Sequence, residues 1–307
     1  MSPRTRQHGA AVLLAMLIVA LAATAAASLM RQQDLALRQL STARDYEQAL
    51  WVLRGGAQWA RSILAQDART SAQDHRGELW ATGLPTTEIE QGTVAGEILD
   101  QQGLFNVNNL VRDGKPSERD IAAFQRLLGI AGLEEGFAEA LTDWIDPDAE
   151  ARAGAGAEDD YYLRLERPYR TPNQPVVEMG ELLRVRGMDA AQLDRLRRYA
   201  TALPRRTPVN VNLAPPEVLA AVIPGLTLAE AEVMASNRAA APFRNLEEFR
   251  AKLPRRELEW KEGELATDSQ FFLVRGRVTV GNADVRLEAL LERDGSRMPL
   301  VLWQRMR

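Results

Sequence analysis

The feature that most constrains this chain is an uncharged, apolar run near its start. From Gly9 to Met30 there are 22 residues without a charged side chain. As a helix rising about 1.5 Å per residue, this run is about 33 Å long, which is enough to cross a bilayer. Arg4 and Arg6 precede it and no acidic residue does, so the positive-inside rule keeps the short N-terminal end in the cytoplasm. The sequence therefore predicts one membrane crossing, with the bulk of the chain on the other side.

A cleaved export signal is the alternative interpretation of this run. Ala25, Ala26 and Ala27 offer a small-residue cleavage site, although the run exceeds the usual apolar region of about 7–15 residues. The sequence that follows favours an anchor, because it contains no proline before Pro85 and keeps a helical period. Apolar residues recur there at spacings of three and four, at Leu40, Ala43, Tyr46, Leu50, Leu53, Ala57, Ala60 and Leu64. We expect one helix of roughly 60 residues; the alternative is an anchor, a break and a separate surface helix.

A short basic leader that ends in glycine and runs into such a helix resembles the type IV pilin-like class. The resemblance implies that a prepilin peptidase cuts between Gly9 and Ala10 and that the new N-terminus is methylated. Ala10 departs from the class, which usually has a bulky apolar residue at that position.

Leu14 is a second departure from the pilin-like pattern. Most such subunits carry Glu at the fifth mature position, where it neutralises the N-terminal ammonium of the preceding subunit, since an unpaired charge in hydrocarbon is costly. A subunit that has no other subunit ahead of it in the assembly meets no such ammonium and needs no such Glu. Leu14 therefore favours the first place in the assembly, at its tip; alternatively, it only adds hydrophobicity to an ordinary anchor.

Strand-like segments lie on both sides of a long helical region. A short strand is expected within 93–103, a hairpin over 271–280 and 284–294, and a last strand over 299–304. Alternation of apolar residues in the hairpin predicts a half-buried antiparallel sheet that covers the amphipathic helix. The expected fold is α+β and pilin-like, with a large all-helical domain inserted into the sheet. The expected parts are a leader (1–9), a membrane half of the helix (10–30), its amphipathic half (31–75), the first part of the sheet (76–103), the insertion (104–266) and the last strands (267–307).

The insertion contains segments that look like helix-hairpin-helix units. Two Asn-x-Asn turns, in 105–111 and 209–215, are expected to cap following helices. Helices are also expected on both sides of Pro224-Gly225 and of Gly187. Such hairpins can offer backbone amides to a phosphate, so an envelope-anchored DNA-binding protein is an alternative function. A net charge of −4 and arginines interleaved with acidic residues favour a packing role, and we expect no nucleic-acid partner.

The segment 141–162 is the most chemically distinctive part of the chain. It holds seven acidic residues, namely Asp143, Asp146, Asp148, Glu150, Glu158, Asp159 and Asp160. The flexible AGAGA stretch between them can fold back and bring the two acidic groups together. Clustered carboxylates suit Ca²⁺, although Ala151 stands where an EF-hand loop needs glycine. A solvated acidic turn and a glycoside hydrolase remain alternatives. With two histidines and no cysteine, a zinc site or a His-based triad is nearly excluded.

Taken together, these motifs resemble the minor pseudopilin K family of bacterial type II secretion systems. The resemblance covers the leader, GLFNVNNLV, LTDWIDPD, GAEDDYYL, RPYRTPNQPVVEMGELLRVRGMD and VNVNLAP, in this order. It implies a non-enzymatic subunit at the tip of a periplasmic pseudopilus, anchored once in the inner membrane. It also implies partners, namely minor pseudopilins I and J, other pseudopilins, the inner-membrane assembly platform and prepilin peptidase. It implies structural calcium near acidic loops, with Asp146, Asp148, Glu158 and Asp159 as the first ligand candidates, and Asp143, Glu150 and Asp160 as further ones.

Overall fold

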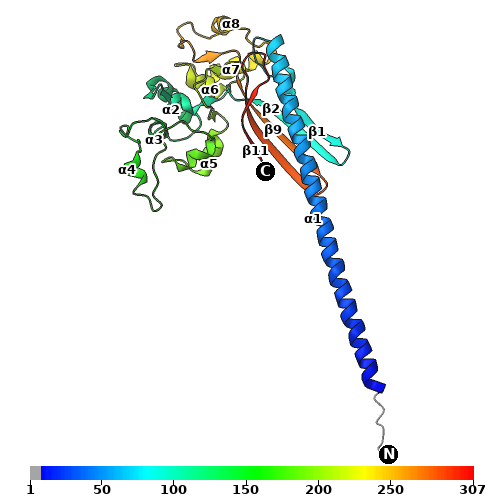
Figure 1. Ribbon diagram of the computed structural model, residues 1–307. Helices are drawn as coiled ribbons and strands as arrows, with labels where there is room; N and C mark the ends of the chain where they lie inside the picture. The colour runs from blue at the N-terminus through cyan, green and yellow to red at the C-terminus, as the bar shows by residue number, and fades with distance from the viewer. Residues whose placement is uncertain (1–7) are drawn as a thin grey trace, which may run out of the picture.

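The computed structural model describes residues 8–307 and shows a long rod that carries a wide head (Figure 1). Helix α1, His8–Thr70, forms the rod and is 63 residues long. The single long helix predicted from the sequence is confirmed, and Gly55 and Gly56 lie inside it without a break. Residues 1–7 of the predicted leader lie outside the described residues, whereas Gly9 and Ala10 fall in the first turn of α1.

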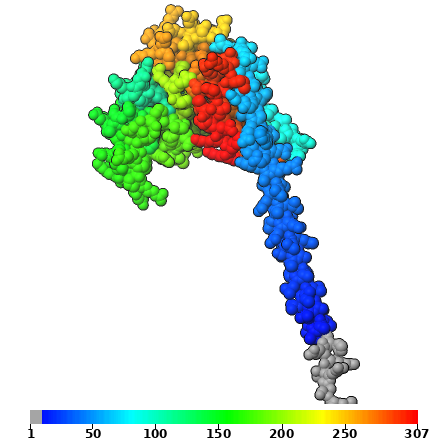
Figure 2. All heavy atoms as spheres, in the orientation of Figure 1, coloured from blue at the N-terminus to red at the C-terminus, as the bar shows by residue number. Residues whose placement is uncertain are grey.

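The N-terminal part of α1 stands clear of the head (Figure 2). Its residues from Ala10 to Arg44 are exposed. Within residues 8–307, α1 is the one helix long and apolar enough to cross a membrane, and its apolar stretch is not buried. The predicted apolar face is wrong for Leu40, Ala43 and Tyr46, which are exposed because the sheet buries α1 only from Ala49 onward.

A five-stranded antiparallel sheet packs against the C-terminal part of α1. Its strand order is β1-β2-β9-β10-β11, so the long insertion separates neighbouring strands β2 and β9. The strands are β1 Leu84–Ile89, β2 Gly92–Asp100, β9 Phe271–Val280, β10 Ala283–Glu292 and β11 Leu300–Met306. The predicted hairpin is confirmed as β9–β10, in which Val280 pairs with Ala283. Strand β1 was not anticipated, because its short and largely exposed segment lacks an apolar alternation.

The alternation of β10 creates the core between sheet and helix. Val285, Leu287, Ala289 and Leu291 point inward while Asp284 and Arg286 point to solvent. The inward side chains pack on the apolar face of α1, formed by Leu50, Leu53, Ala57, Ala60 and Leu64. Contact is close at Gly276 of β9, where an added Cβ would lie 2.8 Å from Leu53 Cδ2. From Ala49 onward, α1 is therefore part of the head and not a separate helix.

The insertion forms a mainly helical domain beside the sheet (Figure 1). Its α-helices are α2 Glu118–Ile130, α3 Phe137–Ile145, α4 Asp159–Tyr162, α5 Ala190–Leu196, α6 Pro216–Val222, α7 Leu228–Ala240 and α8 Leu246–Ala251. The 3₁₀ segments are η1 Leu79–Thr82, which precedes the sheet, and η2 Val107–Leu110 and η3 Met179–Arg184 in the insertion. The α+β class is confirmed, and the helices expected around Pro224-Gly225 are α6 and α7.

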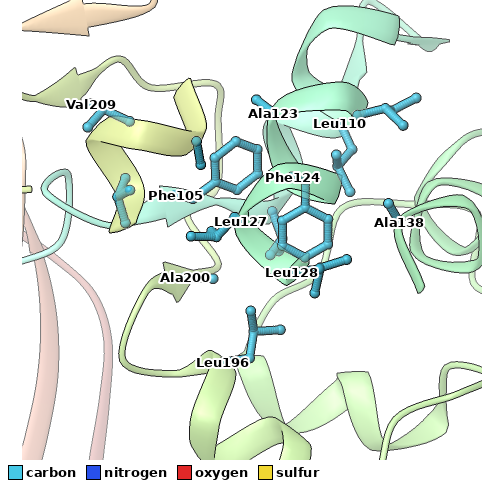
Figure 3. Close-up of a cluster of buried hydrophobic side chains, with 14 of the residues drawn as sticks. Phe105, Leu110, Ala123, Phe124, Leu127, Leu128, Ala138, Leu196, Ala200 and Val209 are labelled. Carbon is cyan, nitrogen blue, oxygen red and sulfur yellow. The ribbon is translucent and has the colours of Figure 1, made fainter. Parts of the chain in front are cut away.

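Three short two-stranded ladders add to the helices, so the insertion is not helical throughout. They pair β3 Phe105–Asn106 with β6 Ala200–Thr201, β4 Val111–Arg112 with β5 Lys115–Pro116, and β7 Val209–Asn210 with β8 Leu265–Ala266. Phe105 from β3 and Phe124 from α2 stack at the centre of the core (Figure 3), with ring centroids 5.2 Å apart. The ladders and this core join both ends of the insertion, which explains how the domain holds its place beside the sheet.

The two Asn-x-Asn turns act as buried cross-links. Asn108 bonds both backbone groups of Val176, donating at 2.9 Å and accepting at 2.8 Å. Asn212 makes the same pair of bonds to Phe243, at 2.9 and 2.8 Å. The first asparagine of the first turn, Asn106, caps η2 as predicted. The cap of α6, by contrast, is Pro215 and not an asparagine of the second turn. The repeated motif therefore reflects a repeated packing device.

Candidate metal centre

The acidic segment folds into a loop that joins α3 to α4. Asp146 is the C-cap of α3, and Glu158 precedes the first residue of α4. The loop between them turns back, so Asp146, Asp148 and Glu158 each offer an oxygen within 4.8 Å of the others. Asp146 is 1% exposed and Glu158 is 5% exposed, which places two of the three carboxylates out of water.

Asp143 organises this loop from its base. Its Oδ2 accepts the backbone N–H groups of Ala157, at 2.8 Å, and of Arg152, at 3.1 Å. Gly156 is required for this fold, because an added Cβ would lie 2.3 Å from the carbonyl oxygen of Arg152 and 2.5 Å from Asp143 Oδ2. The AGAGA stretch therefore closes the loop as the sequence indicated, with Asp143 fastened to backbone amides.

Two carboxylate oxygens in the cluster are left without partners. Asp146 Oδ1 and Glu158 Oε1 are buried, and neither finds a hydrogen-bond partner among the described residues. Burial, reinforced by Asp148 and then Asp143, raises the pKa of Asp146 to about 6. Burial and the charge of Asp143 raise the pKa of Glu158 to about 7. A cation at this point would supply the missing partner and relieve the repulsion between the carboxylates.

The other predicted acidic residues have different positions. Asp159 lies outside the cluster, since it accepts the N–H of Thr171 at 3.0 Å and pairs with Arg170 at 3.2 Å. Glu150 and Asp160 have exposed side chains, and Asp160 lies 3.8 Å from Arg164. The structure thus brings together three of the four first candidates.

Two residues near the cluster were missed in the sequence. Asn173 adopts a positive φ of 47° and donates its Nδ2 to the carbonyl of Asp148 at 2.9 Å. Its own Oδ1 is buried and unbonded within the part of the chain that the structure describes. Thr171 donates its hydroxyl to Glu158 Oε2 at 3.2 Å. Thr171 and Asn173 follow the end of the acidic segment, residue 162, by nine and eleven positions, and only the TPN sequence of a turn marks them.

The helix-hairpin-helix-like turns present acidic caps where a phosphate would bind. At the start of α7, Thr227 accepts the N–H of Glu230 at 3.3 Å, and Glu230 accepts the N–H of Thr227 at 2.9 Å. At the start of α5, Asp189 accepts the N–H of Gln192 at 2.8 Å. A carboxylate at each helix N-terminus occupies the amides that a nucleic-acid phosphate would need and repels it.

The fold and the site define a pilin-like subunit whose long helix is apolar enough to cross a membrane and whose inserted, mainly helical domain bears an acidic loop. Models of the family "Type II secretion system (T2SS), protein K" match residues 103–205 and 209–267. The protein K of Pseudomonas aeruginosa is 32% identical, over 94% of this chain and 90% of that protein. The protein K of Klebsiella pneumoniae is also 32% identical, over 94% of each chain.

A solved structure agrees with these relatives. A chain in the crystal structure of the GspK-GspI-GspJ complex from enterotoxigenic Escherichia coli superposes with a TM-score of 0.75. It is 26% identical, and the match covers 88% of this chain and 99% of that one. This chain belongs to the type II secretion system protein K family, whose members are minor pseudopilins of that system.

Proposed function

We propose that this chain forms the tip of a type II secretion pseudopilus, where it starts and caps assembly. The single observation that carries the proposal is the size and position of the inserted domain, which widens the head far beyond the width of the rod (Figure 2). Subunits that stack through parallel rods need room above each head, and this head leaves none. Leu14, which is exposed on the free part of α1, also supports a position at the tip. A first subunit has no preceding N-terminal ammonium to neutralise and so needs no Glu at this position.

Anchoring and partners follow from the rod. The exposed apolar part of α1 sits in the inner membrane with its N-terminus in the cytoplasm, and the head lies in the periplasm. Prepilin peptidase cuts between Gly9 and Ala10 and the new N-terminus is methylated. Minor pseudopilins I and J pack beside α1, as the related complex supports, and connect this subunit to other pseudopilins and the assembly platform. Burial of apolar surface, at about 25 cal/mol per Å², drives that packing.

Calcium stabilises the acidic loop in this proposal. Asp146, Asp148 and Glu158 hold the ion. Asn173, whose Nδ2 bonds the Asp148 carbonyl and whose Oδ1 is buried without a partner in the described chain, is a further candidate ligand. The role is structural and not catalytic. Alanine at Asp146 and Glu158 is expected to abolish the thermal stabilisation that calcium gives the full chain. Loss of calcium-independent turnover on a glycan would instead support the hydrolase alternative.

Antibody labelling of pseudopili tests the tip position. Cells that assemble long pseudopili are labelled with gold-coupled antibodies raised against the helical insertion. We expect one cluster of gold at a single end of each fibre. Gold distributed along the fibre would refute the capping role. A DNA-binding role has no support from the capped helix starts, and tight, salt-sensitive retardation of DNA by the full chain would be needed to restore it.

A further inference from the structure

A second group of carboxylates lies where the rod joins the head. Asp67 is in the last turn of α1, Asp74 is in the loop that follows, and Glu78 immediately precedes η1. Each offers an oxygen within 4.8 Å of the others. This cluster, called here the joint cluster, belongs to the pilin-like part of the chain and shares no residue with the acidic loop of the insertion.

The joint cluster carries more negative charge than its neighbours balance. Arg293, from the end of β10, pairs with Asp67 Oδ2 at 2.7 Å and with Asp74 Oδ2 at 2.5 Å. His75 Nε2 lies 4.0 Å from Glu78 Oε1. Even with His75 protonated, three carboxylates meet two cations within the described residues. Asp74 is 1% exposed and the Glu78 side chain is 8% exposed, so water does little to screen the excess.

A second observation points to a missing ligand. Asp74 Oδ2 accepts the N–H of Ser269 at 2.6 Å in addition to the bond from Arg293. Its other oxygen, Oδ1, is fully buried and has no hydrogen-bond partner anywhere in residues 8–307. A buried carboxylate oxygen left unpaired loses its hydration without compensation, so native structures normally supply a partner.

Glu78 divides its two oxygens in a similar way. Its Oε2 accepts the backbone N–H of His75 at 3.0 Å and the indole N–H of Trp80 at 2.9 Å. These two donors fix the carboxylate and leave Oε1 for another contact. The joint cluster is therefore a preorganised set of oxygens. Its carboxylates are fixed by hydrogen bonds from Arg293, from the backbone N–H of Ser269 and from the indole N–H of Trp80.

We propose that the joint cluster binds a calcium ion through Asp67, Asp74 and Glu78. Calcium takes oxygen ligands at about 2.3–2.6 Å, so two ligands of one ion are at most about 5 Å apart. The three oxygens of the joint cluster meet this condition, since they lie within 4.8 Å of one another. A set of carboxylate oxygens without sulfur favours such a hard cation over zinc or copper. His75 Nδ1 already accepts the N–H of Gly77, which removes one imidazole nitrogen from metal binding.

The ion would connect the end of α1 to the loop that follows it and, through that loop, to the segment that leads from the insertion back to β9. Asp67 belongs to α1, while Asp74 donates its backbone N–H to Thr267 at 2.9 Å and holds Ser269, in the segment that leads from the insertion back to β9. Arg293 donates to the carbonyl of Ser269 at 2.7 Å. The site thus links the rod, the sheet and the insertion. Its role does not depend on the position of the subunit in a fibre.

A shared proton is the competing explanation for the joint cluster. Burial raises the pKa of Asp74 to about 7, and it also raises the pKa of Asp67. A proton held between these two carboxyl groups would reduce the charge without any metal. The two explanations differ in a measurable way, because only the first gives a bound ion that survives loss of the acidic loop site.

Counting calcium ions on the full chain in detergent tests the proposal. Equilibrium dialysis is performed on the D146N/E158Q variant, in which the acidic loop site is removed. We expect one calcium equivalent to remain, and we expect the added substitution Glu78→Gln to remove it. Glutamine keeps an acceptor for Trp80, so folding is preserved. Asp120→Asn serves as the control, because the Asp120 side chain is nearly as buried as that of Glu78, at 12% against 8% exposed, but accepts from Ser117 away from both clusters.

Terbium luminescence provides a second measurement that needs no change in the acidic loop. Tb³⁺ replaces Ca²⁺ and emits when a nearby tryptophan is excited, and Trp80 bonds directly to Glu78. We expect Trp80→Phe to remove one of two binding phases in the otherwise unchanged chain. The proposal is overturned if D146N/E158Q protein binds no calcium, or if neither Glu78→Gln nor Trp80→Phe alters a binding phase. In that case the shared proton accounts for the joint cluster.

Discussion

Gly156 is the residue on which the geometry of the acidic loop depends most directly. It has no room for a side chain, since an added Cβ would meet the backbone of Arg152 at 2.3 and 2.5 Å and Asp143 Oδ2 at 2.5 Å. Backbone atoms cannot rotate away as a side chain can. The substitution Gly156→Ala must therefore push the Arg152 turn away from Asp143.

The expected size of the effect follows from the contacts that are lost. Overpacking against fixed backbone costs about 1–3 kcal/mol. Each hydrogen bond from a backbone N–H to the Asp143 carboxylate contributes about 1.5–3 kcal/mol, because the acceptor is charged. Because these effects overlap, we expect about 3 kcal/mol in total, or a fall in Tm of about 6–12 °C. Glu158 follows two residues later, so its displacement should weaken calcium binding about 100-fold, which corresponds to about 2.7 kcal/mol.

Thermal unfolding with and without calcium measures both effects. Gly180→Ala is the control, because an added Cβ there lies no closer than 3.7 Å to its nearest neighbour in the described chain. We expect the control to unfold near the wild-type temperature and to keep its calcium response. If Gly156→Ala also keeps both, the loop does not depend on the contacts described here, and the proposed metal centre loses its structural basis.

Two further predictions concern packing and pH. Leu53→Ala removes a buried side chain between α1 and the sheet, and it should lower the free energy of unfolding by about 2–5 kcal/mol in urea. The same change at exposed Leu40 should lower it by less than about 0.5 kcal/mol. Equal losses at the two positions would contradict the packing of α1. The pKa of Glu158 is raised from 4.5 to about 7, so the folded state holds a proton that the unfolded state has already released. Calcium-free protein should therefore lose stability as the pH rises through this window, and saturating calcium should reverse the trend; a rise in calcium-free stability across it would refute the assignment.

The sequence predicted the elements whose pattern is strong and local. Helix α1 and the β9–β10 hairpin follow from periods of 3.6 and 2 that run over many residues. Strand β1 could not be found in this way, because it is an exposed edge strand and its pairing with β2 does not depend on an apolar face. The extent of the apolar face on α1 was also hidden, since it depends on where a sheet built from distant strands begins.

The candidate site was only partly readable for a similar reason. Asp146, Asp148 and Glu158 stood out by composition, and the glycine-rich loop indicated that they meet. Asp159 was grouped with them by adjacency, but the start of α4 turns it toward Arg170 and Thr171. Asn173 and the joint cluster depend on contacts between segments far apart in the chain. Asp74 and Arg293, for example, are separated by 219 residues and meet only in the folded head.

The central claim is that the head admits a single copy of this subunit, at the end of a bundle of rods. Native mass spectrometry of the full chain, extracted in detergent after coexpression with minor pseudopilins I and J, tests it most directly. We expect one assembly that holds one copy of each of the three proteins, at every expression level of this chain. An assembly with two or more copies of this chain would show that its head does allow stacking, and would contradict the account.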